Sequence, residues 1–133
     1  MVCVYCGART NVVNSRLRHK TNEVWRRRRC LQCQAIISTT ESVEYHSAWQ
    51  VKSDSTGLEP FSRDKLFLSL YSSMRHRISA IDDANSLATT IIGRLRPTVT
   101  RGIVRPGDIY AVASIVLSRF DSTSFNTYRA FYG

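Results

Sequence analysis

The chain has 133 residues, of which 43% are hydrophobic, and it carries a formal net charge of +9. This length fits one ordinary domain, or a very small metal-bound module followed by a domain of about 90 residues. No apolar run approaches the roughly 18 residues of a membrane span, so we expect no membrane association. The chain runs from Met1 straight into its first cysteine without a secretory segment, which predicts a cytoplasmic protein with reduced thiols.

All four cysteines lie in two Cys-x-x-Cys motifs, which are separated by 23 residues. Each motif can place two thiolates on one side of a tight turn, and two such turns supply the ligands of a tetrahedral zinc site. A redox motif or a disulfide framework is the alternative, but a redox site would use only one Cys-x-x-Cys motif, and this chain has two. We therefore predict a structural zinc, without an open position for chemistry. Its ligands would be Cys3, Cys6, Cys30 and Cys33.

The positive charge is concentrated in the N-terminal part of the chain. Residues 1–40 hold eight basic residues against one acidic residue, a net charge of +7, whereas the remaining 93 residues carry only +2. Such a field on a small module favours a polyanion, and above all the phosphate backbone of nucleic acid. An acidic membrane surface is the weaker alternative, because no amphipathic helix carries the charge.

Residues rich in β-branched side chains predict three short strands, over 11–16, 24–29 and 35–43. Three strands held by four thiolates make a zinc ribbon, whose core is too small to fold without metal. Alternation along the second strand sends Arg26 and Arg28 to one face and Arg27 and Arg29 to the other, so some of these arginines are solvated or paired with acids. The candidate DNA-binding residues are Arg16, Arg18, Arg26, Arg27, Arg28 and Arg29.

The sequence after residue 46 predicts a β-hairpin followed by helices. Two strands, 49–52 and 58–61, flank a turn, and Ser62 is a suitable N-cap for a helix that reaches about residue 76. Apolar stripes then predict helices over 82–95, from Pro106 to about 120, and over a short aromatic tail at 125–132. The predicted fold class is α+β, with a ribbon at 1–46 and a helical domain at 47–133 packed on its hairpin.

No catalytic constellation occurs in the chain. It lacks a Walker loop, a Gly-x-Gly-x-x-Gly motif and a Ser/His/Asp or Cys/His set, so we predict that it is not an enzyme. One feature of the second domain suggests a ligand. Lys52 on the hairpin and Lys65 in the first turn of the next helix can hold phosphate oxygens, although solvated surface lysines are commoner.

The order of these parts resembles the NrdR family, bacterial repressors of ribonucleotide reductase genes that join a zinc ribbon to an ATP-cone. The resemblance covers nearly the whole chain. Its most specific segments are Cys3-Val4-Tyr5-Cys6-Gly7, Val12-Val13-Asn14-Ser15-Arg16, Arg26-Arg27-Arg28-Arg29-Cys30, Ser38-Thr39-Thr40-Glu41, Val51-Lys52, and Glu59-Pro60-Phe61-Ser62-Arg63-Asp64-Lys65-Leu66.

The resemblance implies a homo-oligomer that binds double-stranded operator DNA and changes its oligomeric state with ATP and dATP as effectors. The nucleotide-binding residues it implies are Val51, Lys52, Glu59 and Lys65. Two alternatives remain open at this point. One is a constitutive nucleic-acid-binding ribbon with a degenerate cone, and the other is an accessory regulatory fragment of ribonucleotide reductase, which also carries ATP-cones.

The sequence departs from the family pattern at informative positions. Ser53 follows Lys52 where the family usually has a phosphate-directed arginine, and the hairpin turn is one residue longer. This difference predicts weaker nucleotide binding or altered discrimination between nucleotides. Three further departures are Asn14 in place of Asp, Ile36 in place of a basic residue, and Thr127 in place of Arg.

Overall fold

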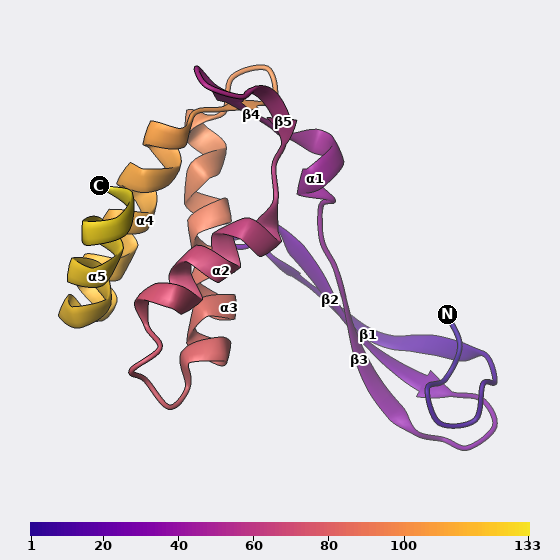
Figure 1. Ribbon diagram of the computed structural model, residues 1–133. Coiled ribbons are helices and arrows are strands. Elements are labelled where there is room, and N and C mark those ends of the chain that lie inside the picture. Colours follow the sequence, from indigo (N-terminus) through magenta and orange to yellow (C-terminus); the bar gives the residue numbers. More distant parts are fainter. The chain divides into compact units, whose positions relative to one another are not determined.

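The computed structural model describes residues 1–133, which divide into two compact units, Met1–Val43 and Glu44–Gly133 (Figure 1). The first unit is a β-sheet and the second combines helices with a small sheet, so the predicted α+β class is confirmed. The boundary predicted after residue 46 falls inside a helical turn, α1 (Tyr45–Ala48), which belongs to the second unit. None of the helices is both long enough and apolar enough to cross a membrane.

The first unit is an antiparallel sheet in the order β1-β2-β3. Its strands are β1 (Thr10–Arg18), β2 (Glu23–Cys30) and β3 (Ile36–Glu41). The only buried side chains in residues 1–43 are those of Cys3 and Cys30, so the sheet has no apolar core of its own. The strand ladder and the four cysteines hold this unit together.

The second unit begins with the predicted hairpin, formed by β4 (Gln50–Ser53) and β5 (Gly57–Pro60). Gly57 has φ 73°, a conformation that suits glycine at the turn. A third strand, β6 (Ile103–Val104), pairs with β4 in parallel and extends the sheet to the order β5-β4-β6. Sequence reasoning missed this strand because two residues are too few to show a period.

Four helices follow or flank this sheet: α2 (Arg63–Ser73), α3 (Ala80–Leu95), α4 (Pro106–Phe120) and α5 (Ser122–Tyr132), with a short 3-10 turn, η1 (Arg96–Thr98). The Ser62 hydroxyl accepts the Lys65 backbone N–H at 3.1 Å, as an N-cap does. Asp121 caps α5 in the same way through Ser124. Helix α2 ends before the predicted residue 76, because Met74 leaves the helical conformation at φ −124°.

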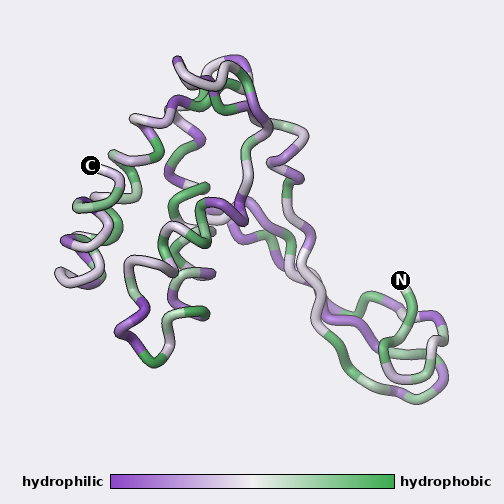
Figure 2. The backbone as a smooth tube through the Cα atoms, viewed as in Figure 1, coloured by the Kyte–Doolittle hydropathy of each residue, from purple (hydrophilic) through white to green (hydrophobic).

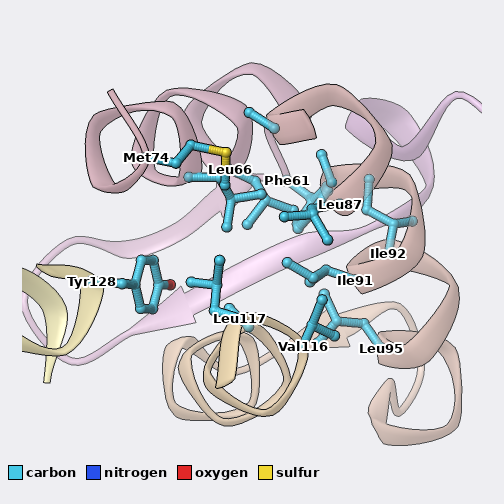
Figure 3. Close-up of a cluster of buried hydrophobic side chains, with 14 of the residues drawn as sticks. Phe61, Leu66, Met74, Leu87, Ile91, Ile92, Leu95, Val116, Leu117 and Tyr128 are labelled. Atoms are coloured by element: carbon cyan, nitrogen blue, oxygen red, sulfur yellow. The ribbon is translucent and has the colours of Figure 1, made fainter. Parts of the chain in front are cut away.

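The apolar stripes of these helices meet in one core, in which side chains from α2, α3 and α4 point toward one another (Figure 3). Apolar and polar segments alternate along the helices, as expected for helices that each bury one face (Figure 2). The apolar stripe that predicts α3 is buried at all six positions, which are Ala84, Leu87, Ala88, Ile91, Ile92 and Leu95. The stripe that predicts α4 ends at Phe120, which is 39% exposed and packs under the Arg77 guanidinium, 4.7 Å from the ring centroid.

Candidate functional sites: a metal centre, an arginine face and a cavity

The four cysteines converge on one point of the first unit. All of their Sγ atoms lie within 4.8 Å of one another, with Cys3 and Cys33 at 3.7 Å and Cys6 and Cys30 at 3.4 Å. Tetrahedral zinc with bonds of about 2.3 Å places its sulfur ligands about 3.8 Å apart. The spacing and the donor atoms therefore fit zinc held by four thiolates. Such a site has no open position, so the metal would stabilise the fold only.

Backbone N–H groups point at the sulfurs in both turns. Tyr5 donates to Cys3 Sγ at 3.4 Å, and Gln32 and Cys33 donate to Cys30 Sγ at the same distance. The residue after each second cysteine has a positive φ, 75° at Gly7 and 62° at Gln34, so the two turns share one backbone shape. These N–H groups stabilise thiolate over thiol, as a metal site requires.

The pKa values of the cysteines show why a cation belongs between them. The backbone N–H of Cys33 lowers the pKa of Cys30 to about 6. The backbone N–H of Ala35 also lowers the pKa of Cys33, but the nearby Cys30 sulfur and burial outweigh it and raise this pKa to about 12. Adjacent thiolates repel one another, and a divalent cation removes that repulsion.

Four arginines share one face of the ribbon sheet, which we call the arginine face: Arg16, Arg18, Arg27 and Arg29. In the β1–β2 register, Arg16 lies opposite Trp25 and Arg18 opposite Glu23, in line with Arg27 and Arg29 on β2. The Arg27 guanidinium lies 5.8 Å from the centre of the Trp25 ring. All four arginines are exposed and none forms an ion pair, so they are accessible to a phosphate backbone.

A β-bulge in β1 determines which arginines lie on the arginine face. The β1–β2 register shifts by one residue between Val12 and Asn14. Without the shift, Arg16 and Arg18 would lie opposite even-numbered residues of β2 and point to the other face, because side chains alternate along a strand. The bulge therefore gathers the exposed arginines of two strands on one side.

The other two candidate arginines are engaged within the sheet. Arg26 forms an ion pair with Glu41 on β3 at 2.5 Å, and the Arg28 Nε donates to the Thr39 hydroxyl at 3.3 Å. Both side chains are half-buried. The structure therefore divides the six sequence-predicted DNA candidates into an exposed set of four and a pair with partners inside the sheet.

The second unit contains a cavity of about 490 Å³ between the hairpin, the start of α2 and the helices α4 and α5. Its lining combines apolar and aromatic side chains with polar ones. The lining residues of most interest are Val51, Ser53, Glu59, Ser62, Lys65, Tyr110, Tyr128 and Tyr132.

Three of the four predicted nucleotide residues meet in this cavity. Val51 and Glu59 are cross-strand partners, and the Lys65 ammonium lies 3.4 Å from the Glu59 carboxylate. Lys52 alternates to the other face of the hairpin and lines a neighbouring groove. The four predicted nucleotide-binding residues are therefore neighbours, but three of them line the cavity and Lys52 lines the groove next to it.

Sequence reasoning missed an aromatic wall opposite the hairpin. The rings of Tyr110 and Tyr128 stack with centroids 5.9 Å apart, and Tyr132 lies 4.8 Å from Tyr128. Burial, with a contribution from Tyr132, raises the pKa of Tyr128 to about 12, so its hydroxyl stays protonated and can donate a hydrogen bond. The signal was present as an i, i+4 tyrosine pair in the aromatic tail, from which only a helix was predicted.

Known proteins resemble this chain along its whole length. Residues 1–41 match the family described as "Transcriptional repressor NrdR-like, N-terminal domain", a zinc ribbon. Proteins named "Transcriptional repressor NrdR" from the Streptococcus pneumoniae strains Hungary19A-6, ATCC 700669 and 70585 are each 32% identical to the chain over 133 residues. Each alignment covers 99% of this chain and 83% of the relative. The match and the clustered thiols together support a structural zinc in the first unit.

Proposed function

This chain belongs to the NrdR family of transcriptional repressors, and from that premise we propose that it binds operator DNA of ribonucleotide reductase genes under the control of ATP and dATP. The first unit would contact DNA and the second would bind nucleotide. The bound nucleotide would set the oligomeric state of the protein, and with it the affinity for the operator. In this proposal the protein acts as a regulator and catalyses no reaction.

The arginine face is the observation that carries the DNA part of the proposal. Four exposed guanidinium groups lie on one side of the sheet, and guanidinium groups can fork onto phosphates or onto guanine edges. Arg26 and Arg28 would contribute long-range charge while they hold β2 against β3. Zinc would act indirectly, because it fixes the strands that present these arginines.

The cavity carries the nucleotide part of the proposal. Tyrosine rings and the apolar side chains of Val51 and Phe61 suit a purine base, which binds by stacking and burial. Lys65 supplies a cation in the cavity lining, beside which phosphate oxygens would lie, and Glu59 can accept a hydrogen bond from a sugar hydroxyl or hold Lys65 in place.

Coupling between nucleotide and DNA requires at least two states of the protein that both ligands distinguish. In this proposal the two states are assemblies that present different arrangements of ribbons. One experiment tests all parts together: the mass of the purified protein is measured by light scattering with no nucleotide, with ATP and with dATP, and operator binding is measured in the same samples. If neither ATP nor dATP changes the mass or the DNA affinity, the result would favour a constitutive nucleic-acid-binding ribbon.

We expect Lys65→Ala to weaken ATP binding about tenfold, because the variant cannot form a charge-assisted hydrogen bond to phosphate at a partly solvated site. Calorimetric titration of the variant and the wild type measures this change. Arg94→Ala is the matched control, since it removes one exposed positive charge from the same unit but lines neither the cavity nor the neighbouring groove. Equal ATP affinity in Lys65→Ala and Arg94→Ala would place the nucleotide elsewhere.

A further inference from the structure

A second hollow of about 570 Å³ lies beside the cavity, between the β4–β5 turn and the start of α4. We call it the turn groove. Its basic side chains are Lys52, from the hairpin, and Arg105, from the residue that precedes α4. Arg105 is far from the hairpin in the sequence, and no motif singled it out. The fold alone brings these two cations to one groove.

The parallel pairing of β4 with β6 explains why the two cations meet. Val51 pairs with Val104, so Lys52 is the next residue on β4 and Arg105 is the residue just after the end of β6, and both line the turn groove. Both side chains are exposed, and neither forms an ion pair or a hydrogen bond with another side chain. Two unpaired cations at neighbouring positions repel each other, and an anion between them relieves that repulsion.

The turn groove adjoins the cavity, because Ser53 and Pro106 line both. We propose that Arg105, together with Lys52, binds the terminal phosphates of an adenine nucleotide whose base lies in the cavity. This inference rests on the proposed nucleotide binding and assigns the groove to the polyphosphate tail.

One acidic side chain in the turn groove would repel a bound phosphate. Asp54 lines the same groove from the hairpin turn, so the groove holds two positive charges against one negative charge. Its carboxylate is exposed and forms no ion pair with Lys52 or Arg105. The balance still favours an anion, and Asp54 lowers the affinity for it. Asp54→Asn is therefore expected to tighten ATP binding severalfold.

The test compares ATP with AMP in calorimetric titrations of the full chain. Arg105→Ala is expected to weaken ATP binding about tenfold and to leave AMP binding unchanged, because AMP lacks the terminal phosphates. Arg105→Lys should retain part of the ATP affinity. Arg94→Ala again controls for the removal of one positive charge and should bind both nucleotides like the wild type. A rescue variant completes the set: Ser53→Arg in the Arg105→Ala background should restore ATP binding, since it returns a guanidinium to the groove.

The outcomes separate this inference from the proposed function. If wild type binds neither ATP nor AMP, the proposed nucleotide binding itself is wrong. If wild type binds ATP and Lys65→Ala weakens it, but Arg105→Ala behaves like Arg94→Ala, the nucleotide site stands and the turn groove is not part of it. Equal weakening of ATP and AMP by Arg105→Ala would also overturn the inference, because it would show a general effect on the cavity.

Discussion

Removal of zinc is expected to unfold the first unit and to abolish its binding to DNA. The only buried side chains of residues 1–43 belong to two of the four cysteines, so no apolar core remains when the metal leaves. Structural zinc contributes about 10–16 kcal/mol in zinc-finger peptides, and that contribution is lost when the metal leaves. Chelation and Cys30→Ser should both release zinc, measured by elemental analysis, and expose residues 1–43 to protease.

Leu31→Ser is the matched control, because Leu31 lies in the same cysteine turn but is 55% exposed and provides no ligand. It should keep one zinc per chain and full DNA binding. The second unit has its own core, so the helical signal and ATP binding should survive chelation. Full zinc occupancy in Cys30→Ser, or protease resistance of residues 1–43 after the metal has been stripped, would contradict the assignment.

The helices of the second unit could be predicted because their signals are local. A stripe repeated over four turns of α3 determines both the helix and the face it buries, and Ser62 marks the start of α2 through its own side chain. The ends of the strands were predicted less accurately, because β1 and β2 extend beyond the predicted ranges. Strand ends depend on which partner can form hydrogen bonds, and a single strand does not show its partner.

The residues that come together in each candidate site were harder to predict from the sequence. Alternation correctly separated Arg26 and Arg28 from Arg27 and Arg29, but the face that Arg16 joins depends on the bulge between Val12 and Asn14. A bulge adds one residue to one strand and leaves no mark in the pattern of residue types. Arg105 was missed for a related reason, since its position beside Lys52 follows from a parallel pairing between distant segments.

Replacement of the exposed pair, Arg27→Ala with Arg29→Ala, is expected to weaken duplex DNA binding far more than replacement of the inner pair, Arg26→Ala with Arg28→Ala. Each double variant removes two positive charges from the same strand, so the long-range field changes equally. Only the exposed pair touches phosphate in the proposed arrangement. The slope of log affinity against log salt should fall by about 0.9 for each phosphate that the variant no longer neutralises.

The inner pair serves as the control because its ion pair with Glu41 is partly exposed, and such pairs contribute about 1 kcal/mol or less to stability. Zinc content and protease resistance should therefore match the wild type in both double variants. Operator and random DNA are compared at several salt concentrations. An equal reduction on both DNAs would assign Arg27 and Arg29 to the backbone, and a reduction confined to the operator would assign them to base edges. Equal salt slopes for the two double variants would show that the arginine face is not the surface that contacts DNA.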